Sequence, residues 1–382
     1  MRTMAIVSKQ ATSVTTEVLI GDEATLRTVV DAWPPGAGIA LDTEFVRERT
    51  YYPRLCLIQV AAADRLALID PLAIADARAL LAPLSDPQRP KLLHAARQDI
   101  EALLPLTGTP LAPVFDTQLA AALLGFAAQI GYADLVQKLL GIELAKGHAR
   151  TDWARRPLSP EQLAYAADDV RYLPALAALL DERLTAAGRR GWMEEESAAL
   201  TDISLYRVEP AEAWRRLKGL ERLQPTVQRA IRALARWREE RAMERDLPRG
   251  WVLPDAALYE IAQTRPRTRE DLSRLASVPR ATADRAAGEI LKALSEAADV
   301  PDDLIADEGT RAGPEQLRQL KTLQQRLLVI AGELEIQQEV LATRRDLAAL
   351  VRGERELPIL SGWRRTIVGE PLLAALQTLS PA

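Results

Sequence analysis

Four carboxylate side chains stand in settings where an acid is costly to bury unless a cation compensates it. Asp42 and Glu44 are two residues apart in LDTEF, directly after the apolar run GIAL, so a strand here would present both from one face. Asp99 follows the apolar run KLLHAA, near the start of the helical stretch QDIEALL. Asp169 comes four residues after Tyr165, and a helix would place both on one face.

This set of side chains predicts a site for two hard divalent cations, Mg²⁺ or Mn²⁺. Such ions prefer oxygen ligands and keep several waters, so three or four carboxylates suffice for a pair. Two ions roughly 3.5–4 Å apart activate a water and stabilise the leaving oxygen when a phosphodiester is cleaved. We therefore expect metal ligands at Asp42, Glu44, Asp99 and Asp169. Tyr165, one helical turn from a ligand, is placed to orient the attacking water.

No single acid carries this prediction, because most Asp and Glu residues are solvated surface groups. Asp116, in VFDTQLAAALLG, is most simply the N-cap of a helix. Asp168 is also acidic and stands three residues after Tyr165, so helical spacing alone leaves the choice between Asp168 and Asp169 open. The prediction depends on all four acids occurring together in their settings.

The composition gives little support to other site chemistry. With two histidines and one cysteine, a zinc site is not expected. We assign no residue to the binding of an organic cofactor. We interpret His94, at the end of a strand, as a packed and hydrogen-bonded side chain. Cys56, inside LCLIQVAAA, is interpreted as a buried structural thiol. A single cysteine excludes an intrachain disulfide and fits a reducing cytoplasm.

No apolar run approaches the roughly 18 residues of a membrane helix, and the first twenty residues lack the features of a secretory signal. We therefore expect a cytoplasmic protein without membrane contact. Separately, no feature of the sequence implies a stable protein partner, and we expect a monomer. The formal net charge of −4 divides unevenly, into −6 over residues 1–205, +6 over 206–292 and −4 over 293–382. An acidic half joined to a basic module suits an enzyme that grips a polyanion in one place and cuts it in another. A modest excess of cations on solvated helix faces is the alternative explanation.

The elements that must position these residues change type along the chain. Short apolar runs bounded by charge or proline predict four strands in the first 115 residues: GIALDTEF, LCLIQVAAA, RLALIDP and KLLHAA. The first three have short polar connections, which predicts an antiparallel meander, whereas KLLHAA follows a helical stretch, as a crossover strand would. From residue 116 onward the pattern predicts helices only. The result is an α/β domain, a mixed sheet flanked by helices.

The helix that carries Tyr165 and Asp169 has clear boundary signals. Ser159 suits the N-cap, Pro160 the first helical position and Gln162 the reciprocal capping partner. Pro174 then either kinks this helix or divides it in two.

The pattern changes again around residues 200–210, which read as a linker. The sequence therefore predicts three domains: an α/β domain that carries the four acids at 1–205, a basic helical domain at 206–295 and a last helical domain at 305–382. The last two are of similar length and suggest a diverged duplication.

The acidic set resembles the DEDD superfamily of two-metal 3′→5′ exonucleases. The D-x-E motif is Asp42-Thr43-Glu44, and the second-motif acid is Asp99. The third motif is Y-x-x-x-D, from Tyr165 to Asp169, which selects Asp169 over its neighbour and identifies the tyrosine subclass. The histidine subclass needs a histidine at position 164, which is alanine.

Within that subclass the chain resembles ribonuclease D over most of its length. The matching segments are LDTEFVRERTYYPRLCLIQVA, HAARQDIEAL, FDTQLAAALLG, GYADLV and ARTDWARRPLSPEQLAYAADDVRYL. The resemblance implies a ribonuclease-H-like catalytic domain followed by two all-α helical bundles of the helicase-and-ribonuclease-D C-terminal (HRDC) type, the second more diverged. In the first bundle, Trp251, Leu253, Leu258 and Ile261 would be core residues. The second would shape a ring or funnel over the active site.

The resemblance implies a specific reaction: hydrolysis at the RNA 3′ end with release of 5′-mononucleotides, on substrates such as transfer-RNA precursors. Asp42 would bridge both cations, Glu44 and Asp169 would complete the nucleophile side, and Asp99 would serve the leaving-group side. Basic and aromatic residues near the motifs are expected to hold the single-stranded 3′ end of the RNA. These are Arg47, Tyr52, Arg150, Trp153, Arg155 and Arg156. Tyr51 and Tyr52 could equally pack at a strand start.

Two alternatives remain at this point. The same chemistry could act on DNA, since helicases also carry the HRDC module. A catalytically silent RNA-binding scaffold on an exonuclease fold is the second alternative, although such relatives usually lose an acid and this chain has all four.

Overall fold

The computed structural model describes residues 17–145, 147, 151–297 and 313–379. They form two compact units. The first contains the chain up to Val46, Leu55–Asp202 and the chain from Gln319 onward. The second contains Arg47–Arg54 and Ile203–Arg318. The three-domain division stays a prediction, but the last helical segment groups with the catalytic unit.

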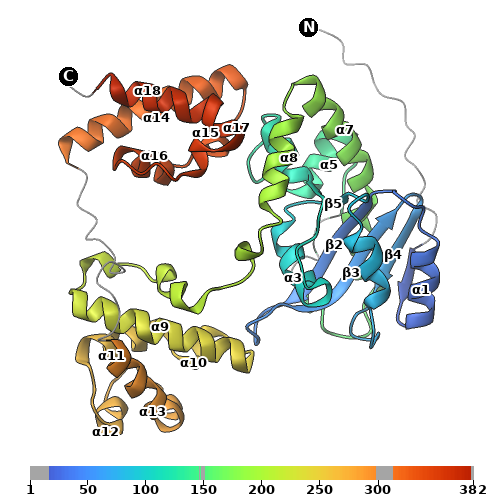
Figure 1. Ribbon diagram of the computed structural model, residues 1–382. Coiled ribbons are helices and arrows are strands. Elements are labelled where there is room, and N and C mark those ends of the chain that lie inside the picture. The colour runs from blue at the N-terminus through green and yellow to red at the C-terminus, as the bar shows by residue number, and fades with distance from the viewer. Residues whose placement is uncertain (1–16, 146, 148–150, 298–312, 380–382) are drawn as a thin grey trace. The chain divides into compact units, whose positions relative to one another are not determined.

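A six-stranded mixed sheet forms the centre of the first unit (Figure 1). Its order is β1-β4-β3-β2-β5-β6. The strands are β1 (Glu17–Ile20), β2 (Ile39–Val46), β3 (Arg54–Ala62), β4 (Arg65–Ile69), β5 (Lys91–Leu93) and β6 (Val114–Asp116). β3 and β4 pair antiparallel, while β1–β4, β2–β5 and β5–β6 pair parallel.

The predicted α/β class is confirmed, because helices flank this mixed sheet. The four strands expected from apolar runs are β2 to β5, and β5 joins β2 in the parallel sense that a crossover gives. β1 and β6 were not among the four expected strands, since three or four residues are too few for an alternating pattern to show. After Asp116, every element that the described residues form is a helix.

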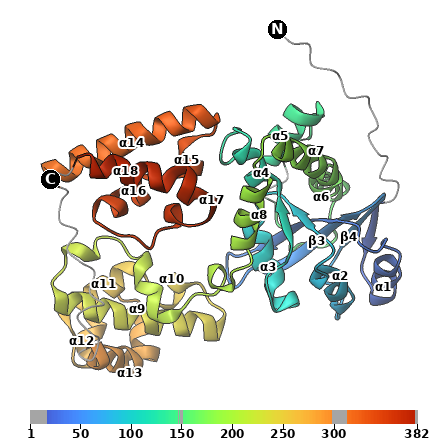
Figure 2. The ribbon, with the colours of Figure 1, turned by 45° about the horizontal axis from the view of Figure 1, so that its top comes forward.

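Helices cover the sheet and carry the third acidic motif (Figure 2). They are α1 (Glu23–Asp31), α2 (Leu81–Ser85), α3 (Arg97–Thr107), α4 (Thr117–Leu123), α5 (Tyr132–Leu140), α6 (Pro160–Arg171), α7 (Leu173–Ala186) and α8 (Arg190–Ala199). α6 buries Ala166, Ala167 and Val170 in the same core cluster as Leu57 and Leu68 of the sheet. This packing fixes the helix against the strands that hold the other acids.

The ends of α6 follow the sequence signals. Ser159 accepts from the backbone N–H of Gln162, and the side chain of Gln162 accepts from the N–H of Ser159, which is the predicted reciprocal cap. α6 ends at Arg171 and α7 begins at Leu173, so Pro174 falls in the first turn of a new helix. Of the two outcomes expected for Pro174, division of the helix is the one observed.

The C-terminal helices of the first unit share a core with the catalytic helices. They are α14 (Pro314–Leu334), α15 (Gln338–Leu341), α16 (Arg344–Val351), α17 (Gly362–Arg364) and α18 (Glu370–Gln377). Leu323, Leu327 and Ile330 of α14 belong to one buried cluster with Leu180 of α7 and Met193 of α8. The hydrophobic effect therefore holds the C-terminal segment and the catalytic helices together as one folded body.

The second unit is a small helical bundle. Its main helices are α9 (Pro225–Arg245), α10 (Arg249–Val252), α11 (Asp255–Thr264), α12 (Arg269–Ser273) and α13 (Arg280–Glu296). Leu253, Leu258 and Ile261 are fully buried, as expected. The expectation that Trp251 is a core residue is wrong, because its side chain is 59% exposed. The single turn of α10 ends at Val252, and the chain then extends at Leu253, so only Leu253 turns inward.

Candidate active site

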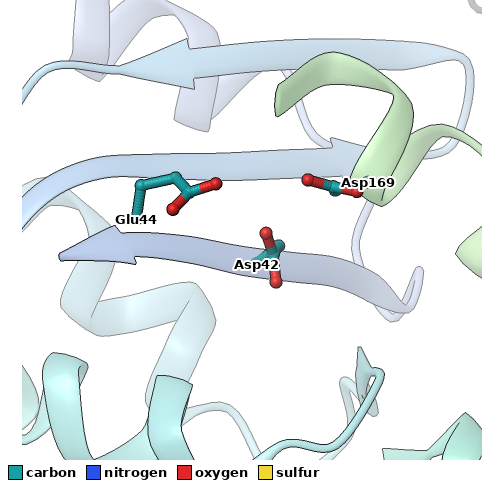
Figure 3. A group of neighbouring side chains, drawn as sticks. All are labelled: Asp42, Glu44 and Asp169. Carbon is teal, nitrogen blue, oxygen red and sulfur yellow. The ribbon is translucent and has the colours of Figure 1, made fainter. Parts of the chain in front are cut away.

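Three of the predicted acids come together in the first unit. Asp42 and Glu44 leave β2, Asp169 leaves the C-terminal part of α6, and the three carboxylates point toward one another (Figure 3). Each offers a ligand oxygen, and these oxygens lie within 4.8 Å of one another. The strand spacing of Asp42 and Glu44 and the packing of α6 on the sheet create this arrangement.

Asp99, in the first turn of α3, is held beside this group by the residue between the two strand acids. Its Oδ1 accepts from the backbone N–H of Thr43 at 3.0 Å and from the Thr43 hydroxyl at 2.6 Å. Asp99 is 6% exposed and raises the pKa of Glu44 by its negative charge. Asp99 is therefore close enough to act with Asp42, Glu44 and Asp169, although it lies outside the group whose oxygens are within 4.8 Å of one another.

All four acids line a single cleft of about 830 Å³. This volume lies within the roughly 300–1,000 Å³ that is usual for small-ligand sites. The other lining residues include polar and apolar side chains: Thr43, Phe45, His94, Arg97, Gln98, Asp116, Gln118, Leu119, Gln129, Tyr132, Tyr165, Leu173 and Leu200.

The acids of the cleft are destabilised in their charged form. Burial raises the pKa of Glu44 to about 9, with further increases from Asp42, Asp169 and Asp99. Burial and the charges of Asp168 and Asp99 raise the pKa of Asp169 to about 7. The pKa values of Asp42 and Asp99 are also raised, first by burial and then by a neighbouring carboxylate.

Such a group fits a divalent metal site. Several carboxylates forced together have a strong need for positive charge, and a bound cation would relieve both the repulsion and the cost of burial. Hard oxygen donors in this number suit Mg²⁺ or Mn²⁺. The acidic cluster therefore has the composition of a divalent-metal site.

Tyr165 lies beside the cluster and distinguishes the two acids that follow it on α6. Its hydroxyl hydrogen-bonds to the carboxylate of Asp169, and burial raises the pKa of Tyr165, so it stays a neutral phenol. Asp168 instead forms an ion pair with Arg171, with Nε and Oδ1 2.9 Å apart. The structure therefore brings Asp169, and not Asp168, to the acids on β2.

The expected RNA-contacting residues are distributed differently. Trp153 is 2% exposed, with its ring centroid 6.2 Å from that of Tyr165. Arg156 binds Asp70 through Nε at 2.6 Å and the Cys56 carbonyl through Nη2 at 2.7 Å. Arg155 is exposed, and Arg150 lies outside the described residues.

Arg47 and Tyr52 belong to the second unit, in the loop Arg47–Arg54. Arg47 is exposed and Tyr52 is 43% exposed. Tyr51 of this loop is buried, with its hydroxyl donating to Glu239 and its backbone N–H donating to Asp246. Of the two roles open to Tyr51, packing is the one observed.

The sequence did not reveal two residues that position Asp99. Thr43 lies within D-x-E, but the motif alone does not indicate its bonds to Asp99. Asp116 caps α4, as expected, by accepting from the N–H of Gln118 at 2.8 Å. It also accepts from the N–H groups of Ala95 and Ala96 at 3.0 and 2.9 Å, which fixes the start of α3 and hence Asp99. Its position at the end of a short apolar run (VFD) was the available signal.

The interpretations of His94 and Cys56 agree with the structure. His94 is hydrogen-bonded through Nδ1 to Thr117 Oγ1 and through Nε2 to the Ile130 carbonyl, both at 2.9 Å. Burial lowers the pKa of His94. Cys56 is fully buried. Within the described part of the chain, no helix is long and apolar enough to cross a membrane.

Comparisons with known proteins identify the family of the chain. Residues 18–185 match the family model for a 3′-5′ exonuclease, and residues 227–294 match the HRDC domain. Ribonuclease D of Gluconacetobacter diazotrophicus is 39% identical, over 94% of this chain and 92% of that protein. Ribonuclease D of Pseudomonas paraeruginosa is 37% identical, over 94% of this chain and 97% of that protein.

A solved structure extends the likeness to the fold. The crystal structure of Escherichia coli RNase D, an exoribonuclease involved in structured RNA processing, matches with a TM-score of 0.85 and 32% identity. The match covers 95% of this chain and 99% of that one. From these similarities and the clustered acids, we conclude that the chain belongs to the ribonuclease D family and is a 3′→5′ exoribonuclease.

Proposed function

We propose that this exoribonuclease trims structured RNAs with a single-stranded 3′ end, such as transfer-RNA precursors, by two-metal-ion hydrolysis that releases 5′-mononucleotides. The observation that carries the proposal is the meeting of Asp42, Glu44 and Asp169 within 4.8 Å, with Asp99 lining the same cleft. The reported role of the Escherichia coli relative in structured RNA processing supports the substrate class.

The four acids would hold two cations, Mg²⁺ or Mn²⁺. By the family resemblance, Asp42 would contact both, with Glu44 and Asp169 on the side of the attacking water and Asp99 on the side of the leaving group. When bound, the pair would activate a water and stabilise the departing 3′-oxygen of the phosphodiester. Thr43 keeps one oxygen of Asp99 occupied, so the other oxygen of this carboxylate remains for a ligand role.

Tyr165 would contribute by orientation. Because its pKa is raised, its hydroxyl keeps its proton throughout the neutral range and can donate a hydrogen bond. In the structure the acceptor is Asp169. With cations bound at Asp169, the hydroxyl would be free to donate this one proton to the attacking water instead, which would fix one lone pair of the water and leave another for in-line attack.

RNA would be held by exposed arginine and aromatic side chains. Direct contact with RNA requires an exposed side chain, and this condition is met by Arg47, Tyr52 and Arg155. Arg150 lies shortly before Arg155 in the sequence and is proposed for the same role. Trp153 and Arg156 are engaged with the protein, so we propose that they act by shaping the segment before α6.

The experiment is a time course on a 3′-extended transfer RNA with Mg²⁺, Mn²⁺ or a chelator. We expect stepwise shortening from the 3′ end with mononucleotide products, arrest by the chelator, and loss of activity in Asp42→Asn. Tyr165→Phe should lose less activity than Asp42→Asn, because the four carboxylates remain.

Several outcomes would contradict the proposal. A folded Asp42→Asn enzyme that keeps more than about a tenth of the wild-type rate would exclude these ligand roles. RNA binding without mononucleotide release would favour a silent scaffold. Faster shortening of a matched DNA strand, with recessed or overhanging 3′ ends, would favour a DNA substrate.

A further inference from the structure

One glutamine in the active-site cleft is held in a fixed orientation. Gln118 is the second residue of α4, and its backbone N–H donates to Asp116 Oδ1 at 2.8 Å. Its side-chain Nε2 donates to the carbonyl of Ile130 at 3.0 Å. Gln118 is half-buried and Ile130 is buried, so both ends of the contact are anchored in the fold.

These bonds determine which way the amide faces. A backbone carbonyl can only accept a hydrogen bond, so the nitrogen of the Gln118 amide must face Ile130. The amide oxygen therefore faces elsewhere, and no donor among the described residues reaches it. The amide oxygen of Gln118 is not fully buried, so solvent or a ligand can approach it.

Two other glutamines of the same cleft differ. Gln98 and Gln129 line it, but their side chains are exposed and have no hydrogen bond from the residues that the structure describes. Their amides must lose conformational freedom before they can recognise a ligand, whereas Gln118 has already lost it on folding. Of the three cleft glutamines, Gln118 is therefore the one whose amide is already oriented before a ligand binds.

The nucleotide that is removed must occupy this cleft while its phosphate meets the acids. A free amide oxygen accepts a hydrogen bond, so its target must carry a donor. The ribose 2′-hydroxyl is a donor on every RNA nucleotide and is missing from DNA. A donor on the base would serve only some nucleotides, and the 3′-hydroxyl occurs in DNA as well. The acids and cations act on a phosphodiester that RNA and DNA share, so they cannot make this distinction.

We propose that Gln118 is a specificity-determining residue that accepts a hydrogen bond from the 2′-hydroxyl of the 3′-terminal nucleotide. This inference rests on the proposed function, because it assumes that the cleft holds the nucleotide being removed. Ile130 and Asp116 act as positioning residues for the amide.

The test uses the full-length protein and a short single-stranded RNA whose last nucleotide is either ribo or 2′-deoxy. We expect wild type to favour the ribo end in kcat/KM by about 3- to 10-fold, the effect of one hydrogen bond. Gln118→Met keeps the side-chain length and removes the acceptor. It should bring the ratio close to one by slowing the ribo end and leaving the deoxy end unchanged. Gln98→Met is the matched control and should keep the wild-type ratio.

A substrate-side measurement keeps the proposal testable if Gln118→Met folds poorly. With wild-type enzyme, a terminal 2′-fluoro nucleotide has no donor and should react like the deoxy end. A terminal 2′-amino nucleotide has a donor and should recover much of the ribo rate.

The outcomes separate the two proposals. No mononucleotide release from any end would count against the proposed function. Normal release with an unchanged ribo-to-deoxy ratio in Gln118→Met, or equal rates on 2′-fluoro and ribo ends, would overturn the role of Gln118. A changed preference among terminal bases with the sugar ratio intact would assign the amide to the base instead.

Discussion

Thr43 donates two hydrogen bonds to one carboxylate oxygen of Asp99, from its backbone N–H at 3.0 Å and from its hydroxyl at 2.6 Å. The two residues are 56 positions apart, so this pair ties the first turn of α3 to the strand that carries Asp42 and Glu44. Since Asp99 is buried, its orientation depends on these bonds.

Removal of the Thr43 hydroxyl should therefore impair catalysis more than folding. We expect Thr43→Val to lower kcat by about 10- to 100-fold, because a hydrogen bond to a charged group contributes about 1.5–3 kcal/mol. The backbone bond remains and limits the loss. The cation concentration for half-maximal activity should rise in parallel. Thr43→Ser retains a hydroxyl and should behave like wild type. Equal activity of the valine and serine variants would show that the backbone bond alone orients Asp99.

The adjacent acids of α6 offer a matched pair of variants. Asp169→Asn removes charge from the cluster and should reduce kcat/KM on the order of 100-fold or more, because charge stabilisation by metal contributes several kcal/mol. Asp168→Asn removes a partner of Arg171 at a partly exposed site and should leave activity within about threefold of wild type. Initial rates of the two variants, measured on one RNA at the same Mg²⁺ concentration, distinguish the roles of Asp169 and Asp168. Comparable losses in both variants would mean that the assignment to Asp169 alone is incorrect.

Cation binding should stabilise the first unit even without RNA. A ligand that binds only the folded state raises stability in proportion to the logarithm of its concentration, by about 2.7 kcal/mol at 100 times its dissociation constant. We expect Mg²⁺ or Mn²⁺ to raise the melting temperature of the wild-type protein by a few degrees and a chelator to reverse this. Asp42→Asn should show no such shift. A shift of the same size in that variant would place the stabilising cation elsewhere.

The sequence was most informative where local chemistry determines structure. The cap of α6 at Ser159 depends on four consecutive residues, and Asp42 with Glu44 depends on the alternation of a strand. Burial of whole side chains was harder to predict. Trp153 was expected to hold RNA and is buried, whereas Trp251 was expected in a core and is exposed.

These two tryptophans differ in partners that are distant along the chain. Trp153 meets Tyr165 of α6 and the strands that α6 covers. Trp251 lies in the one-turn helix α10 and points to solvent. Leu253, which follows that helix, fills the bundle core instead. In the same way, the bond from Thr43 to Asp99 and those from Asp116 to Ala95 and Ala96 join separate segments. No single sequence displays such pairings, because they arise only when the sheet has formed.

Lys91 of β5 gives the fold a distinct dependence on pH. It is fully buried, its Nζ donates to the Asp86 carbonyl at 2.8 Å, and burial lowers the pKa of Lys91 to about 8. Between about pH 8 and the ordinary value of 10.5, the unfolded chain binds a proton that the folded chain does not. Stability should therefore rise with pH across this window, by about 3 kcal/mol at most.

Tyrosines titrate in the same range, so the comparison must be with Lys91→Met. We expect the urea-unfolding free energy of wild type to rise relative to that of Lys91→Met between pH 8 and pH 10. A constant difference between the two proteins would show that Lys91 keeps an ordinary pKa in the folded state.

Trp363 should be a main contributor to the attachment of the C-terminal helices to the catalytic ones. Its ring stacks on Trp192 of α8 with centroids 4.3 Å apart and planes inclined by 8°. Its backbone N–H and indole N–H donate to Glu195 and Glu196, both at 2.8 Å. Because the side chain is 7% exposed, Trp363→Ala should cost about 3–5 kcal/mol and lower the melting temperature of the first unit.

Trp251→Ala is the matched control, since it removes the same side chain from a position that is 59% exposed. Its effect on unfolding should stay within about 0.5 kcal/mol. Thermal denaturation followed by near-ultraviolet circular dichroism distinguishes the two variants. If Trp363→Ala melted like Trp251→Ala, the shared core of α14 with α7 and α8 would hold the C-terminal segment without help from the tryptophan stack, because those aliphatic contacts remain in both proteins.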